Sequence, residues 1–130
     1  AVNWYTLTKS DDVVVPRANL PKLITGIKEI GKRYNFNTVC FGHLGDGNLH
    51  VNILKESISD QDWETKIPEG IGEIFKLTVR LGGTLSGEHG IGVSKRPYMP
   101  IAVSEVNLNL MRGIKKVFDP NGILNPGKIF

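Results

Sequence analysis

The spacing of hydrophobic residues changes along the chain and predicts both strands and helices. Residues 11–16 hold three consecutive valines closed by a proline, which predicts a short buried strand. Three later segments repeat apolar residues every three or four positions, and this period is typical of helices. These helices are expected over about 20–33, from Ser59 to Leu81, and after Ser104. Pro68 should kink or restart the second one.

Two segments of alternating polarity flank the dipeptide Asp46-Gly47, which predicts a β-hairpin with a two-residue turn. In that register His43 lies directly opposite His50, and side chains alternate between the two faces. One face is apolar apart from a glycine and is expected in the core: Cys40, Gly42, Leu44, Leu49, Val51, Ile53. The other face is polar: Phe41, His43, Gly45, Asn48, His50, Asn52. A three-residue loop would move the histidines out of register.

The order of strand, helix, hairpin, helix, loop and helix predicts an α+β fold, with a small mainly antiparallel sheet and helices on one face. A chain of 130 residues is expected to form one domain. Because it starts at Ala1 and not at a methionine, we expect a domain of a longer protein.

Composition excludes several classes of protein. A single cysteine, Cys40, rules out an intrachain disulfide and an all-cysteine metal site. No apolar run approaches the roughly 20 residues of a membrane span, and no signal peptide is visible, so a cytoplasmic protein is expected. The net charge of +3 is small, which argues against nucleic-acid binding. Its basic excess lies near the last helix, where a solvated face is the simpler interpretation.

The two hairpin histidines suggest a metal site. Directly opposed side chains have Cβ atoms about 4.5–5.5 Å apart, and two imidazoles at that spacing can bind one ion. Glu88 follows Gly87 in a glycine-rich loop, and its carboxylate is a natural third ligand that leaves positions open for substrate. His89, next in the chain, is then free to act as a base near neutral pH. Two simpler alternatives stay open: histidines that stack or hydrogen-bond on a solvated face, and a solvated Glu-His pair in a surface loop.

The glycines do not form a nucleotide-binding loop. The segments that start at Gly42 and at Gly87 have the wrong order for the dinucleotide fingerprint, and neither ends in the Gly-Lys-Ser/Thr of a P-loop. A nicotinamide or ATP site within this chain is therefore not expected.

Three motifs together resemble the C-terminal domain of FAD-linked oxidases, a family that includes the glycolate oxidase D subunit, D-lactate dehydrogenase and D-2-hydroxyglutarate dehydrogenase. They are FGHLGDGNLH at 41–50, GGTLSGEHGIG at 82–92 and FDPNGILNPGK at 118–128. They occur in the order typical of the family. The segment DVVVPR at 12–17 is similar to the family's strand before its first helix.

The resemblance implies a ferredoxin-like α+β domain that carries substrate and metal over residues 1–130. The FAD is expected on a separate domain of the same protein that these residues do not include. The family pattern implies that His43, His50 and Glu88 bind a divalent ion, zinc being the expected one. It also implies that His89 contacts the substrate and acts as the base, that Asn52 contacts the substrate, and that Asn125 lies at the flavin.

The function implied by the resemblance is part of an FAD-dependent dehydrogenase that oxidises a 2-hydroxy acid, such as D-lactate or glycolate, to the 2-oxo acid. The isolated chain is expected to be inactive. The expected partners are the small 2-hydroxy acid and the FAD-binding domain, with no nucleic acid and no membrane span; a homodimer or a larger complex stays open. The alternative is a non-catalytic binding or assembly module of a flavoprotein complex.

Overall fold

The computed structural model describes residues 7–130. They fall into two compact units, one that ends at His89 and one over Gly90–Phe130. Among residues 7–130, no helix is both long enough and apolar enough to cross a lipid bilayer. The cytoplasmic location stays a prediction.

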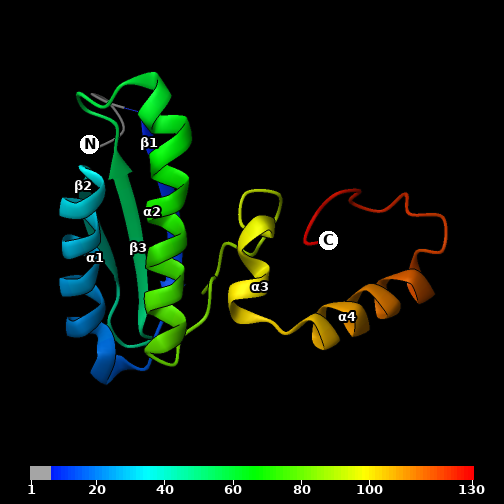
Figure 1. Ribbon diagram of the computed structural model, residues 1–130. Helices are drawn as coiled ribbons and strands as arrows, with labels where there is room; N and C mark the ends of the chain where they lie inside the picture. Colours follow the sequence, from blue (N-terminus) through cyan, green and yellow to red (C-terminus); the bar gives the residue numbers. More distant parts are fainter. Residues whose placement is uncertain (1–6) are drawn as a thin grey trace. The chain divides into compact units, whose positions relative to one another are not determined.

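The first unit is built on a three-stranded antiparallel sheet. Its strands are β1 (Thr8–Val14), β2 (Asn37–His43) and β3 (Asn48–Leu54), in the order β1-β3-β2. After a short 3-10 turn, η2 (Arg17–Asn19), the helix α1 (Leu20–Tyr34) runs beside α2 (Asp60–Arg80) over one face of the sheet (Figure 1). The predicted α+β fold, with helices on one face of an antiparallel sheet, is confirmed.

The chain order of this unit is that of a ferredoxin-like fold whose last strand is reduced to one bridge. After α2 the chain returns to the free side of β1, where Thr84 pairs with Val14 in an isolated antiparallel bridge. The amide of Thr84 donates to the carbonyl of Val14 at 2.9 Å, and the reverse bond is 3.3 Å. The β-α-β-β-α order followed by this bridge matches the ferredoxin-like topology. The bridge also brings the segment after α2 to the edge of the sheet.

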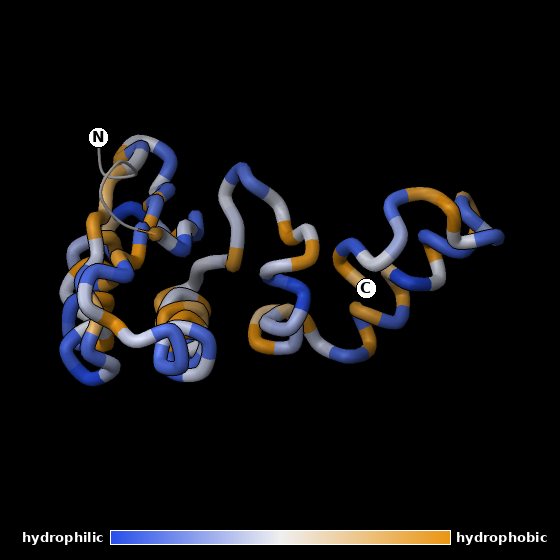
Figure 2. Tube along the Cα trace, turned by 90° about the horizontal axis from the view of Figure 1, so that it is seen from above, coloured by the Kyte–Doolittle hydropathy of each residue, from blue (hydrophilic) through white to orange (hydrophobic). Residues whose placement is uncertain are grey.

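The core of the first unit lies between the sheet and the two helices. Leu49, Val51 and Ile53 are buried on the central strand β3. They alternate with the polar residues of β3, as side chains on a strand must. The helices contribute buried apolar side chains at helical spacing: Leu20, Leu23, Ile27, Ile30, Trp63, Ile67, Ile71, Ile74, Phe75. Figure 2 shows the apolar side of α2 turned toward the strands and its polar side turned away.

The ends of α2 follow from local sequence. Ser59 caps the helix, since its hydroxyl accepts from the amide of Asp62 at 3.1 Å. At the other end Gly82 adopts φ +79°, and its amide and that of Gly83 bond back to the last turn, which is a Schellman motif. Of the two effects expected at Pro68, the restart is wrong, because α2 continues through it as one helix, and the kink stays a prediction. A proline removes one amide donor, and the buried side chains on both sides of Pro68 hold the helix together.

The hairpin register differs from the prediction by two residues. The loop between β2 and β3 has four residues, 44–47, so His43 pairs with Asn48 and His50 pairs with Phe41. The predicted direct opposition of His43 and His50 is therefore wrong.

One bond within the hairpin and one to the end of β1 hold the longer loop. The amide of Asp46 bonds back to the carbonyl of His43 at 3.0 Å, and the carbonyl of Gly47 accepts from the amide of Val15 at 3.1 Å, which ties the loop to the end of β1. A shift of two residues keeps every strand side chain on its predicted face. Leu44, however, leaves the expected core for the loop and is 71% exposed.

The second unit contains η3 (Arg96–Tyr98), the short helix α3 (Met99–Ala102) and α4 (Glu105–Phe118). Ser104 caps α4 by accepting from the amide of Asn107. Asp119 ends it, accepting from the ammonium of Lys115 at 2.8 Å and from two amides of the following turn at 3.0 Å. These bonds, with Lys115 the largest contributor, lower the pKa of the Asp119 carboxyl. The predicted last helix is confirmed.

Candidate metal and substrate site

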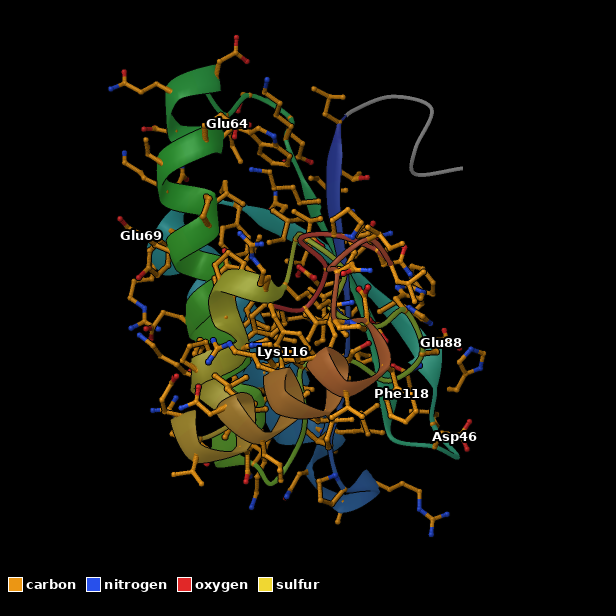
Figure 3. All side chains as sticks on the ribbon, turned by 90° about the vertical axis from the view of Figure 1, so that its right-hand side faces the viewer. Asp46, Glu64, Glu69, Glu88, Lys116 and Phe118 are labelled. Carbon is orange, nitrogen blue, oxygen red and sulfur yellow. The ribbon has the colours of Figure 1, made fainter. Side chains whose placement is uncertain are left out.

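The face of the sheet away from the helices is polar. The central strand β3 contributes Asn48, His50 and Asn52 to this face, and all three are buried, with His50 only 8% exposed. Figure 3 shows Glu88 on the side of the sheet opposite to α2, which carries Glu64 and Glu69. The sheet alone therefore separates the hydrophobic core from a layer of groups that can carry chemistry.

Three side chains on this polar face form a cluster with the donor types of a metal site. His43, His50 and Glu88 each offer one ligand atom, and these atoms all lie within 4.8 Å of one another. His50 Nε2 is 2.9 Å from Glu88 Oε1. His43 and His50 are diagonal neighbours across the two strands, and their rings meet edge to face at 5.8 Å and 80°. Diagonal neighbours on a sheet are within reach of side chains as long as histidine.

The cluster fits a divalent ion after a small rearrangement. Ligand atoms at about 2.0–2.2 Å from a tetrahedral ion are roughly 3.4 Å apart. The contact of 2.9 Å between His50 and Glu88 lies below that separation and the outer limit of 4.8 Å lies above it, so some ligand atoms must separate and others approach. His43 is exposed and has room to rotate, whereas His50 is held by the ring of Phe41, stacked at 5.2 Å and 28°. Two imidazoles and one carboxylate suit zinc and similar ions and leave coordination positions for a substrate.

His89 lies beside this cluster on the solvent side. Its Nε2 is 3.7 Å from Glu88 Oε1, and its ring centre is 5.0 Å from that of His50. The side chain is 52% exposed. An imidazole in this position can exchange a proton with a molecule held at the cluster, provided that the molecule approaches from solvent.

Asn52 lies two residues beyond His50 on the same face. Its Oδ1 accepts from the Ser10 hydroxyl at 2.6 Å, which orients the carboxamide and leaves its amide group to donate. Lys9, by contrast, points to the helix side of the sheet, where its ammonium donates to the Trp63 carbonyl at 3.0 Å and lies 3.6 Å from Glu64. Lys9 is thus not part of the polar face.

Two residues of the polar face received no role from the sequence. Asp12 is fully buried and anchors the loop that carries Glu88 and His89. Asn48 is 5% exposed, and its Oδ1 finds no hydrogen-bond partner among the described residues. A Cβ atom added to Gly87 would lie 2.8 Å from that oxygen, so Asn48 packs directly beneath the loop. Strand alternation places both residues on this face, but the bonds from the loop amides to Asp12 are visible only in the structure.

Asn125 belongs to the second unit, in the turn after α4. It adopts φ 44°, and its carbonyl accepts from the amide of Lys128 at 3.3 Å. Five of the predicted site residues lie in the first unit: His43, His50, Asn52, Glu88 and His89. Asn125 lies in the second unit.

The sequence matches a known family along nearly its whole length. The family model described as FAD linked oxidases, C-terminal domain, matches residues 2–129. The chain belongs to this family.

Relatives of the FAD-linked oxidase family match the chain at similar levels of identity. The glycolate oxidase subunit GlcD of Bacillus subtilis is 38% identical over 120 residues, which is 92% of this chain and 25% of the relative. The D-lactate dehydrogenase of Anaerostipes hadrus is 37% identical, over 91% of this chain and 25% of the relative. The D-2-hydroxyglutarate dehydrogenase of Stutzerimonas stutzeri is 42% identical, over 92% and 26%. The chain thus spans about a quarter of the length of these relatives.

Proposed function

We propose that this chain is the metal- and substrate-binding part of an FAD-dependent enzyme that oxidises a small 2-hydroxy acid to the 2-oxo acid. The observation that carries the proposal is the cluster of His43, His50 and Glu88, with His89 beside it. Membership of the FAD-linked oxidase family supports it, as do relatives named for glycolate, D-lactate and D-2-hydroxyglutarate. The FAD would be held mainly by another domain of the same protein.

In this proposal His43, His50 and Glu88 hold a divalent ion, zinc being our first choice. The ion, when bound, supplies a Lewis acid that lowers the pKa of an attached hydroxyl. His50 Nε2 lies 2.9 Å from Glu88 Oε1, so an ion bound through Nε2 would take the place of the contact between these two side chains.

The remaining polar side chains would orient the substrate and move its proton. His89 accepts the proton of the 2-hydroxyl, since its imidazole is exposed and lies beside Glu88. Asn52 donates from its amide group to a substrate oxygen, an orientation that the bond from Ser10 supports. The flavin, when bound, would supply the group that accepts a hydride from the 2-carbon of the substrate. Asn125 is proposed as a contact to the flavin.

The test is metal-dependent binding of a 2-hydroxy acid to the 130-residue chain. The chain is loaded with cobalt(II), and D-lactate or glycolate is titrated while the visible absorption of the ion is recorded. Propionate is the matched control, because it has the carboxylate of lactate but lacks the hydroxyl. We expect the hydroxy acids to change the spectrum and propionate to change it much less. Equal responses to lactate and propionate would contradict recognition through the hydroxyl.

The alternative, a non-catalytic assembly module, predicts that the cluster is dispensable. A full-length protein in which His43, His50 and Glu88 are all replaced by alanine would then keep its turnover. Loss of turnover in a folded triple variant would instead favour the proposed role.

A further inference from the structure

We propose that Asp12 is a positioning residue that sets both Glu88 and His89 at the candidate site. The inference rests on the proposed function, since it gives a role to a residue beside the proposed metal ligand and the proposed base. Asp12 lies on β1 directly across from His50 on β3. The strand pair that positions His50 therefore also positions the anchor of the loop.

One oxygen of Asp12 holds the backbone of the loop. Asp12 Oδ2 accepts from the amides of Gly87 and Glu88, each at 2.6 Å, and from the amide of His89 at 3.2 Å. Bonds from amides to an ionised carboxylate are stronger than bonds between neutral groups. Because these three amides are consecutive, the carboxylate defines the path of the chain at both functional residues.

The other oxygen faces side chains. Asp12 Oδ1 accepts from the hydroxyl of Ser86 at 3.2 Å and lies 3.5 Å from His89 Nδ1. A carboxylate beside Nδ1 favours the tautomer that carries its proton there. His89 Nε2 lies 3.7 Å from the Glu88 carboxylate, but Glu88 is half exposed and also contacts His50 Nε2. We infer that the buried Asp12 decides the tautomer and leaves the Nε2 lone pair to accept a proton. The geometry thus orients the base as well as its loop, as the buried aspartate does in the Ser-His-Asp triad.

Burial makes this arrangement specific. Asp12 is 0% exposed, so its carboxyl group is solvated by protein groups and not by water. Replacing Asp12 by the isosteric asparagine separates its hold on the loop backbone from its effect on the His89 tautomer. The single oxygen of the asparagine can take the place of Oδ2 and keep the amide bonds of the loop, while its amide group would face His89 Nδ1 and favour the opposite tautomer.

The experiment compares Asp12→Asn, Asp12→Ala and the unchanged 130-residue chain. Asp46→Asn is the control, an aspartate in the exposed hairpin loop. Two quantities are measured: the tautomer of His89 from ¹⁵N chemical shifts in the metal-free chain at pH 8, and the dissociation constant for cobalt(II). We expect the proton on Nδ1 in the unchanged chain and the control, and on Nε2 in Asp12→Asn. Asp12→Ala should weaken cobalt binding about 10- to 100-fold, as loss of a supporting partner of a metal ligand typically does, and Asp12→Asn should weaken it less.

The two readouts separate this inference from the proposed function. If the unchanged chain binds no cobalt, the proposed metal site fails, while the tautomer still tests Asp12. If Asp12→Ala does not fold, Asp12→Asn decides by the tautomer alone. The same tautomer in the unchanged chain and in Asp12→Asn would overturn the inference, as would unaltered cobalt affinity in a folded Asp12→Ala chain. A merely structural aspartate would lower stability without changing the tautomer.

Discussion

Replacing Gly87 by alanine should disturb the candidate site through packing alone. The added Cβ would lie 2.6 Å from Val14 Cγ2 and 2.8 Å from the carboxamide of Asn48, closer than real carbon contacts allow. Neither neighbour is the end of a long flexible side chain, and Asn48 is buried under the loop. The loop must therefore either stay in place under strain or lift away from the sheet.

The magnitude follows from the cost of each response. Overpacking of this kind typically costs about 1–3 kcal/mol. Lifting the loop instead stretches its bonds to Asp12, and a hydrogen bond to a charged group contributes about 1.5–3 kcal/mol. We therefore expect the free energy of unfolding of the first unit to fall by about 1–3 kcal/mol. Because lifting moves Glu88, metal affinity should fall as well.

Native-state hydrogen exchange measures the expected fall in the free energy of unfolding. The amide of Val51 lies in the centre of the sheet, and its exchange reports the opening of the first unit. Gly45→Ala is the matched control in the same unit, since a Cβ there meets nothing within 4 Å. The Gly45→Ala substitution should be neutral or should stabilise the first unit by about 0.4–1 kcal/mol. Equal exchange rates and equal metal affinity in Gly87→Ala and Gly45→Ala would refute the packing argument.

Three further predictions concern single groups. Burial raises the pKa of the Cys40 thiol, so a disulfide reagent at pH 7.5 should modify Cys40 more slowly than free cysteine and should accelerate in urea. Bonds from Lys115 and two amides lower the pKa of the Asp119 carboxyl, so its contribution to stability is present above the ordinary carboxyl pKa and is lost as the pH falls through the lowered one; carboxyl NMR titration should show this, and Asp119→Asn should reduce the loss of stability on acidification. Ser10→Ala should weaken binding of a 2-hydroxy acid to the metal-loaded chain by about 2- to 10-fold in calorimetry, because Asn52 loses the bond that orients its carboxamide.

The sequence predicts the elements of the first unit well because their signals are local. The helical repeat of buried residues and the cap at Ser59 are confirmed, as is the glycine end of α2. The sheet faces also follow from the sequence, because a register error of two residues leaves alternation intact.

The hairpin loop and the anchor of the Glu-His loop depend on distant contacts. The four-residue loop is held by the bond from Val15 to Gly47, which no hairpin pattern contains. Asp12 reaches residues more than 70 positions away, so its three amide bonds have no counterpart in local sequence. The candidate ligands and base could be named from motifs and resemblance, whereas the contacts between Asp12 and the Glu-His loop required the fold.

The most direct test of the central claim is the metal content of the chain. The 130-residue chain, incubated with zinc and desalted, is compared by mass spectrometry with the variants His50→Ala and His89→Ala. We predict about one ion per chain for the unchanged protein and for His89→Ala, because His89 is proposed as the base and not as a ligand, and none for His50→Ala. An unchanged chain without zinc, or a His50→Ala chain that retains it, would contradict the account.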